Sequence, residues 1–264
     1  MRGRNDTVVL GYHAVSETWP SSLAVSPARL EQQVRWLLRR GFRGVTFYEA
    51  VMAPPTRKTF AVTFDDGYRS VLLEGLPVLE QLGVPGTVFP SITYIDSDEP
   101  LVGPALQHWL GTEHEAELKS MTWDELRRLA DGGWEIGSHT VTHPYLPELG
   151  DDELERELVD SKARLEREID RPCRTIAYPS GRFDDRVARA AARAGYAVAG
   201  ALPRRLPGAP SPLAWPRISV SRDDTRFTFA LKVSPFVRRA RTTAAWVSVD
   251  NLRIRLARGS HSAA

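Results

Sequence analysis

Two adjacent carboxylates, Asp65 and Asp66, end an apolar stretch and stand directly before a glycine. Residues 59–64 are β-branched, aromatic or small and carry no charge, which predicts a strand, and residues 69–82 are predicted as a helix. Acids at a strand-to-helix turn are how α/β barrels present catalytic groups at one face. The alternative is that one aspartate only caps the next helix, but two adjacent acids exceed what one cap requires.

Two histidines, His139 and His143, follow another predicted strand at a spacing of four. On a helical turn this spacing places both imidazoles on one side, and two imidazoles with one carboxylate leave a coordination position open, as in catalytic zinc sites. A metalloprotease would need a glutamate directly after the first histidine, where this chain has Thr140. Glycosidases also use two acids, but they hold them apart across the sugar, which adjacent residues do poorly. Asp66 is therefore the candidate ligand, and Asp65 the candidate base that takes a proton from the activated water.

Strand-like and helix-like segments alternate along the 264 residues, which predicts one α/β domain of barrel size with parallel strands and crossover helices. The predicted strands are 7–12, 44–47, 59–64, 85–89, 133–138, 174–178, 196–201 and 215–220. The predicted helices are 27–40, 69–82, 122–131, 151–169 and 184–194. Residues 91–121 interrupt the alternation after a strand end, so we expect them to form a substrate wall on the active face.

Composition limits the function classes. The net charge is only +2, which does not favour a nucleic-acid binder. The single Cys173 excludes an intrachain disulfide and is interpreted as structural or incidental. The sequence shows neither a signal peptide nor a run of eighteen apolar residues. We therefore expect a cytoplasmic protein, and the sequence leaves open a peripheral contact with a membrane.

The C-terminal segment differs from the rest of the chain, so we predict a barrel over residues 1–221 and an extension over residues 222–264. Within residues 227–256, basic residues are interleaved with aromatic and aliphatic ones. The basic residues are Lys232, Arg238, Arg239, Arg241, Arg253 and Arg255, against the single acid Asp250. Such a composition indicates either an interfacial segment on anionic lipid or a helix that packs on the barrel with an arginine-rich outer side.

Several short motifs together resemble those of the polysaccharide deacetylases, which share the chitooligosaccharide-deacetylase homology domain and form carbohydrate esterase family four. The two main motifs are Thr63-Phe64-Asp65-Asp66-Gly67 and His139-Thr140-Val141-Thr142-His143. The others are Gly11-Tyr12-His13, Met121-Thr122-Trp123, Gly137-Ser138-His139 and Ala177-Tyr178-Pro179-Ser180-Gly181. The resemblance covers about residues 7–220.

The resemblance implies a distorted (β/α)7–8 barrel and a divalent metal, usually zinc, with cobalt or nickel as alternatives. It implies hydrolysis of N-acetyl groups from an amino-sugar glycan or glycoconjugate, with release of acetate. Carried over by position, Asp65 matches the catalytic base, and Asp66, His139 and His143 match the metal ligands. The backbone of Ser180 matches the donor that stabilises the tetrahedral oxyanion.

Tyr178, Pro179 and Ser180 belong to the third motif, which departs from the common pattern. Many members carry an arginine where this chain has Ala177, and many also carry a late leucine-x-histidine that supplies the general acid, which is absent here. The Tyr-Pro-x-Gly form is similar to the subgroup that acts on exopolysaccharides such as poly-N-acetylglucosamine.

Two residues are candidates for the missing groups. His13 ends the first predicted strand, and histidine is the side chain type most often used as a general acid at neutral pH, although it could instead be a structural histidine. Arg217 lies in another predicted strand and could orient Asp65, although it could instead pair with a surface acid.

We therefore predict a metal-dependent deacetylase of N-acetylated glycans with no role for nucleic acid. A carbohydrate-binding domain that kept the fold and lost turnover, or a hydrolase of a small non-sugar amide, are the alternatives.

Overall fold

The computed structural model describes residues 6–52, 57–103, 106–202, 211–241 and 243. Its central strand is β5 (Lys58–Asp66), whose residues after Lys58 are all buried. β5 pairs in parallel with β1 (Asp6–Tyr12) and with β6 (Gly86–Pro90). A parallel strand that is buried on both faces has a nearly continuous apolar sequence. This explains why the strand before the two aspartates could be predicted.

The parallel strands form a closed ring. One sheet has the order β11-β1-β5-β6-β7 and a second has the order β10-β9-β8. The remaining strands of the ring are β7 (Glu135–Ile136), β8 (Thr175–Ala177), β9 (Val198–Ala201), β10 (Trp215–Pro216) and β11 (Ile218–Ser219). A parallel bridge between Ser138 and Ile176 joins β7 to β8, and β10 runs through Arg217 directly into β11. The predicted distorted barrel is confirmed, with residues 215–219 as the segment that closes it.

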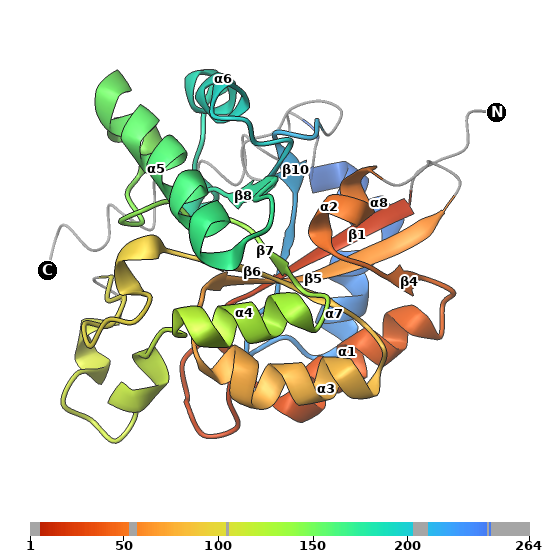
Figure 1. Ribbon diagram of the computed structural model, residues 1–264. Helices are drawn as coiled ribbons and strands as arrows, with labels where there is room; N and C mark the ends of the chain where they lie inside the picture. Colours follow the sequence, from red (N-terminus) through yellow and green to blue (C-terminus); the bar gives the residue numbers. More distant parts are fainter. Residues whose placement is uncertain (1–5, 53–56, 104–105, 203–210, 242, 244–264) are drawn as a thin grey trace, which may run out of the picture.

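Helices cover the outside of this ring (Figure 1). Their bounds are α1 (Pro27–Leu38), α2 (Phe47–Met52), α3 (Leu76–Gln81), α4 (Trp123–Asp131), α5 (Asp151–Ile169) and α6 (Asp185–Arg193). The helix starts follow the expected cap chemistry, because Ser26 accepts a hydrogen bond from the N–H of Arg29, and Thr122 with Glu125 forms a capping box. In the long helix α5, the buried face includes Leu154, Leu158, Leu165 and Ile169.

Several predicted elements differ in the structure. The strand predicted at 133–138 is limited to β7, and the strand predicted at 215–220 is divided into β10 and β11. The strand predicted at 44–47 is limited to β4 (Arg43–Gly44), and α2 begins at Phe47 because Thr46 and Glu49 exchange cap hydrogen bonds of 3.2 and 3.4 Å. The helix predicted at 69–82 starts with a π-turn (Val71–Gly75) before α3. Pro77 lacks the N–H that a continuous α-helix would need at this point.

The rim at the carboxyl ends of the strands contains more structure than the sequence predicted. Within 91–121, three 3-10 turns occur, namely η2 (Ile92–Tyr94), η3 (Gln107–Trp109) and η4 (Glu115–Leu118). Two further turns are η5 (Leu146–Glu148) and η6 (Pro179–Gly181). A small parallel pair, β2 (Ala14–Val15) with β3 (Ala24–Val25), brackets the loop between them. That loop was not predicted to be part of the site.

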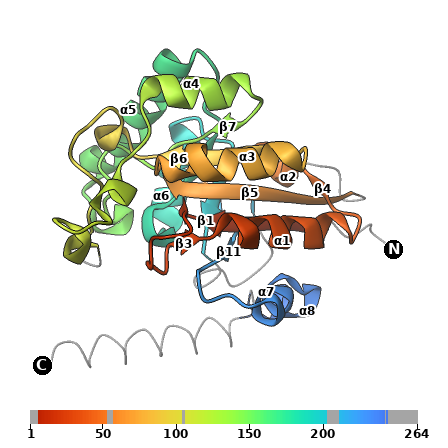
Figure 2. The same ribbon diagram turned by 90° about the horizontal axis from the view of Figure 1, so that it is seen from below.

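The chain continues after β11 into α7 (Arg226–Val233) and α8 (Pro235–Arg241). Phe229 of α7 packs edge-to-face on Trp36 of α1, with ring centroids 5.9 Å apart. α7 and α8 lie on the side of the barrel opposite α4 (Figure 2). The division at residue 221 stays a prediction, and residues 244–264, including His261, lie outside the described residues.

Across the described ranges, we find no helix with the length and apolar character needed to cross a bilayer. The expected cytoplasmic location stays a prediction. Cys173 is buried, and burial raises the pKa of its thiol to about 12, which fits a structural residue.

Candidate active site

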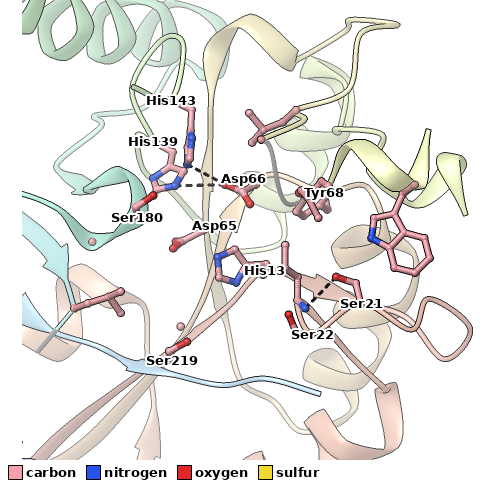
Figure 3. A pocket seen from close by; sticks show the side chains of 18 of the residues that line it. His13, Ser21, Ser22, Asp65, Asp66, Tyr68, His139, His143, Ser180 and Ser219 are labelled. Atoms are coloured by element: carbon pink, nitrogen blue, oxygen red, sulfur yellow. Dashed lines mark hydrogen bonds and ion pairs between the residues drawn. The ribbon is translucent and has the colours of Figure 1, made fainter. Parts of the chain in front are cut away.

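The predicted site residues converge at the carboxyl ends of the strands. Asp65 and Asp66 end β5, and His13 follows β1. His139 and His143 follow β7. All five line one cavity of about 640 Å³, together with Ser180 (Figure 3). Arg217 also lines this cavity. The barrel thus brings together residues that are more than 200 positions apart in the chain.

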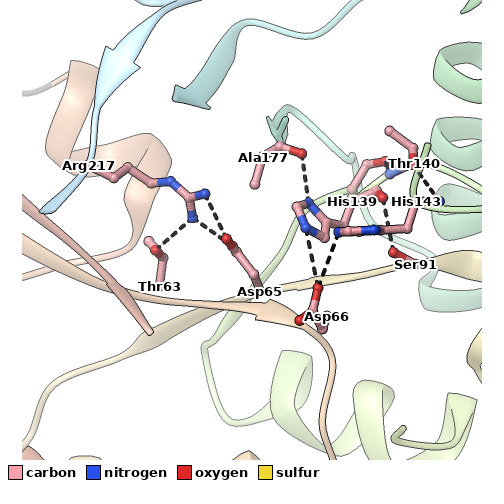
Figure 4. A network of polar contacts seen from close by, with 10 residues as sticks. Thr63, Asp65, Asp66, Ser91, His139, Thr140, His143, Ala177 and Arg217 are labelled. Carbon is pink, nitrogen blue, oxygen red and sulfur yellow. Dashed lines mark hydrogen bonds and ion pairs between the residues drawn. The ribbon is translucent and has the colours of Figure 1, made fainter. Parts of the chain in front are cut away.

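Asp66, His139 and His143 form the candidate metal centre (Figure 4). Asp66 Oδ1 lies 3.4 Å from Nε2 of His139 and 3.6 Å from Nε2 of His143, and the candidate ligand atoms all lie within 4.8 Å of one another. Tetrahedral zinc with bonds of about 2.0–2.1 Å separates its ligand atoms by roughly 3.4 Å. The spacing therefore fits one cation held by these three side chains.

Hydrogen bonding leaves the ligand atoms available. Nδ1 of His139 lies 2.8 Å from the carbonyl oxygen of Ala177, so this nitrogen donates and Nε2 keeps its lone pair for a metal. Asp66 Oδ1 is buried and has no hydrogen-bond partner among the described residues. A buried carboxylate oxygen left in this state indicates an absent ligand. The donor set therefore fits a divalent cation.

The pKa values in this centre reflect burial and mutual charge. Burial and the neighbouring His139 ring lower the pKa of His143 to about 4, so His143 is neutral at physiological pH. Burial alone would lower the pKa of His139, but the carboxylates of Asp65 and Asp66 outweigh it and raise that pKa. Burial alone would raise the pKa of Asp66, but the surrounding histidines lower it. The centre thus offers a carboxylate and a neutral imidazole, and a cation would compete with a proton for His139.

The two histidines lie on a loop, so the predicted helical turn is wrong. Thr140 and His143 have positive φ angles of 71° and 62°, which a right-handed helix does not allow. Glu157 of α5 holds the loop from outside: its carboxylate accepts the N–H groups of Val141 at 2.7 Å and Thr142 at 3.0 Å. The same carboxylate accepts the Thr142 hydroxyl at 2.6 Å. Glu157 was missed because, in the sequence, it is one of several acids on an exposed helix.

The two adjacent aspartates contact different partners because the backbone turns between them. Asp66 has φ of 67° and Gly67 has φ of 74°, so the strand ends in left-handed geometry. Asp66 consequently faces the histidines, while Asp65 faces Arg217 on the other side (Figure 4). Strained backbone of this kind often occurs at functional sites.

Asp65 and Arg217 form a buried bidentate pair. Nη1 and Nη2 of Arg217 donate to the two carboxylate oxygens at 2.6 and 2.8 Å, and Nη1 also lies 3.2 Å from the Thr63 hydroxyl. Burial would raise the pKa of Asp65, but the guanidinium and the nearby His139 hold it well below its usual range. A Cβ at Gly200 would lie 2.7 Å from Arg217 Nε, so this glycine makes room for the arginine. The structure thus shows the predicted contact, and the catalytic role of Arg217 stays a prediction.

His13 lies beside the two aspartates in the cavity (Figure 3). Its ring is partly exposed, but Nδ1 is buried and lacks a hydrogen-bond partner in the described part of the chain. The ring is therefore placed where a proton donor could act, whereas a structural histidine would have Nδ1 bonded. Its role as general acid stays a prediction.

The third motif places Ser180 on the cavity wall. The N–H of Tyr178 donates to the carbonyl of Gly200 at 3.1 Å, its hydroxyl donates to Leu213 at 2.9 Å, and Pro179 has no N–H. Of the three predicted residues, Ser180 is therefore the one that could offer a backbone donor. It sits in left-handed geometry with φ of 54°, which directs the turn toward the cavity.

Two loops complete the walls. The 91–121 excursion contributes Leu101, Gly103, Leu106, His108 and Trp109, so its predicted place on the active face is confirmed. Residues 20–23, from the loop between β2 and β3, also line the cavity and were not predicted. The available signal was their position just after a strand end, where binding loops concentrate.

Fold and site together define a barrel protein with a carboxylate–imidazole group able to hold a metal ion and a buried acid beside it. The profile of the family described as polysaccharide deacetylase matches residues 53–199, and this chain belongs to that family. The recognition from short motifs is thereby confirmed.

Relatives and solved structures agree with this assignment. The chain is 28% identical over 193 residues to YxkH of Bacillus subtilis (strain 168), which is named as a provisional polysaccharide deacetylase. This match covers 71% of the present chain and 61% of YxkH. It is 27% identical over 150 residues to the poly-β-1,6-N-acetyl-D-glucosamine N-deacetylase of Escherichia coli (strain K12). This match covers 53% of the present chain and 21% of the E. coli protein. The crystal structure of a polysaccharide deacetylase from Bacillus cereus aligns with a TM-score of 0.70 at 26% sequence identity. The alignment covers 86% of the present chain and 69% of the B. cereus chain. The chain thus spans less than two thirds of these two curated relatives.

Proposed function

We propose that this protein is a metal-dependent N-deacetylase of an amino-sugar glycan or glycoconjugate. The observation that carries the proposal is the meeting of Asp66, His139 and His143 around one point, with the Asp65–Arg217 pair in the same cavity. A protein that only binds glycans has no need for a buried carboxylate that an arginine keeps ionised. An N-deacetylase needs both groups.

The proposed roles follow from the positions. When bound by Asp66, His139 and His143, a divalent cation supplies a Lewis acid for the acetamide carbonyl and activates water. The nitrogen and oxygen donors suit zinc, and cobalt and nickel accept the same set. Asp65 is ionised and fixed by two hydrogen bonds, so it accepts the proton that the attacking water loses.

Two further residues of the cavity carry the remaining steps. The backbone N–H of Ser180 donates to the developing oxyanion. His13 delivers a proton to the nitrogen as the carbon–nitrogen bond breaks, so that acetate and a free amine leave. We expect His13→Ala to lower kcat about 10²–10⁴-fold, the range for general acid catalysis, with metal content unchanged. Full turnover by this variant would remove His13 from the mechanism.

The glycan nature of the substrate is supported by the size and lining of the cavity. A volume of about 640 Å³ suits one or more sugar rings, and Trp109 and Tyr145 provide aromatic walls. The named E. coli relative acts on a poly-N-acetylglucosamine. We therefore place N-acetylglucosamine-containing glycans first among the substrates.

The test is acetate release from a panel of N-acetylated glycans, with a small N-acetylated amide that lacks a sugar as comparison. Each substrate is assayed with and without a chelator, followed by zinc restoration. We expect chelator-sensitive acetate release from the glycans only. Release from the small amide alone would indicate a non-sugar amidase, and glycan binding without acetate release would indicate a binding domain.

A further inference from the structure

Helix α7 has apolar side chains on both of its faces. Phe229 and Val233 form the inner face and are buried against the barrel, at 2% and 3% exposure. Phe227 and Leu231 are also four residues apart, so they share another face, and they are 75% and 50% exposed. Phe236 at the start of α8 is 80% exposed. A helix that met only water would carry polar residues on this outer side.

A basic pocket opens next to these side chains. It has a volume of about 180 Å³ and lies between α1 and the start of α7, with Trp36 and Phe229 among its lining residues. Arg39, Arg40 and Arg226 line it. Arg39 and Arg226 are exposed and form no ion pair with any described residue, and Arg40 stacks on Trp36 at 3.4 Å from the ring centroid. The acid in the pocket, Asp224, is bound by Lys232 at 2.6 Å.

In the sequence, the C-terminal segment has a net charge of the opposite sign from the rest of the chain. Residues 222–264 contain nine of the 35 lysines and arginines and three of the 33 acids, a net charge of +6, which leaves −4 for residues 1–221. Exposed phenylalanine and leucine beside unpaired arginines are the combination that binds an interface of anionic lipid. None of the described residues of α7 or α8 lines the catalytic cavity, so such contact would not block it.

We propose that α7, the start of α8 and the basic pocket form a docking surface for an anionic phospholipid bilayer. Phe227, Leu231 and Phe236 insert among the acyl chains near the headgroups. Arg39 and Arg226 bind the lipid phosphates. The surface lies on the flank of the barrel, opposite α4, so the protein would bind the bilayer sideways (Figure 2).

The experiment is vesicle flotation of the full chain, with phosphatidylcholine vesicles and with vesicles containing one quarter phosphatidylglycerol. We expect binding only to the anionic vesicles, with a decrease at high salt. The triple variant Phe227→Ser, Leu231→Ser, Phe236→Ser should lose vesicle binding. Arg39→Gln with Arg226→Gln should weaken it by roughly tenfold or more, from about 1 kcal/mol for each arginine near an anionic surface.

A matched control tests whether any loss is specific. Leu73 and Val159 are 60% and 41% exposed on other parts of the barrel, so Leu73→Ser with Val159→Ser should leave vesicle binding unchanged. Acetate release from a soluble glycan should be the same in all variants, which separates this proposal from the proposed function. Equal binding of the wild type to both kinds of vesicle, or no binding to either, would overturn the proposal. Light scattering that shows a dimer disrupted by the triple variant would assign the surface to a second copy of the chain instead.

Discussion

The two ends of the barrel differ in whether their buried polar groups have hydrogen-bond partners. At the amino end of the strands, Glu135 accepts hydrogen bonds from the hydroxyl of Thr175, the N–H of Tyr48 and the hydroxyl of Thr87 at 2.6, 2.9 and 3.3 Å. At the carboxyl end, Asp66 Oδ1 and His13 Nδ1 are buried without a partner in the described structure. One end is internally satisfied and holds the fold together. The other keeps polar atoms free for a ligand, which is the physical signature of a site.

The two ends also differ in the charge of their buried acids. Asp65 faces Arg217, which holds its pKa well below the usual range although burial acts in the other direction. Glu135 has no such cation, and burial raises its pKa despite its three hydrogen bonds. The acid that is expected to accept a proton is thus kept ionised, whereas the structural acid moves toward its neutral form.

The largest effect should come from Asp66→Asn, which removes a charged ligand and keeps the shape. We expect loss of bound metal and of acetate release to background. Asp65→Asn is the matched control, because it should keep the metal and still lose turnover. Metal analysis after dialysis, together with the acetate assay, distinguishes them. If both variants kept the metal, Asp66 would not be a ligand.

Removal of the Arg217 guanidinium, which pairs with Asp65, should destabilise the fold. Arg217→Ala leaves a buried carboxylate without its partner, which costs about 3–5 kcal/mol in comparable pairs. We expect urea unfolding at pH 7 to show this loss, and the acetate assay to show a lower kcat. Arg217→Lys keeps the charge but not the two parallel hydrogen bonds, so it should recover stability better than activity. Equal recovery of both would reduce Arg217 to a structural role.

Loss of the Glu157 carboxylate, which holds the loop that carries His139 and His143, should weaken metal binding without abolishing it. Glu157→Ala removes three hydrogen bonds to Val141 and Thr142. We expect zinc affinity to fall about 10–100-fold, as for other groups that orient metal ligands, with kcat restored at saturating zinc. Glu155→Ala changes the same charge on the exposed side of α5 and should leave zinc affinity unchanged. Calorimetric titration of both variants with zinc makes the comparison.

The smallest effect concerns Glu135 at the amino end. Because its pKa is raised in the folded state, its carboxyl group favours folding most below its unfolded pKa of about 4.3, and this contribution is lost as the pH rises. Glu135→Gln removes that dependence. The stability of the variant relative to the wild type should therefore improve from pH 4 to pH 7, as measured by urea unfolding. A relative stability that fell over this range would show that the hydrogen bonds, and not burial, dominate.

The sequence predicted the parts of the site that are local in the chain. Asp65 with Asp66 and His139 with His143 each lie within one motif, so spacing and strand ends were enough to place them. The Asp65–Arg217 contact joins two residues 152 positions apart and depends on ring closure by the bent segment 215–219. Periodicity carries no information on such closure, which explains why Arg217 could only be suggested.

Local cap chemistry and loop geometry account for most of the other differences. Thr46 with Glu49 is a capping box that outweighs the strand propensity of residues 44–47. The histidine loop takes left-handed geometry because Glu157, from a helix further along the chain, binds its backbone. Neither the loop 20–23 nor the turn around Ser180 has a periodic pattern that could indicate its conformation.

Anomalous diffraction at the zinc edge, from crystals of the full chain grown with zinc, tests most directly whether Asp66, His139 and His143 hold one cation. We predict one strong peak in the cavity, bound by Asp66, His139 and His143, with Asp65 still paired to Arg217. A peak held by other residues, or one that includes Asp65 as a ligand while Arg217 turns away, would contradict the account.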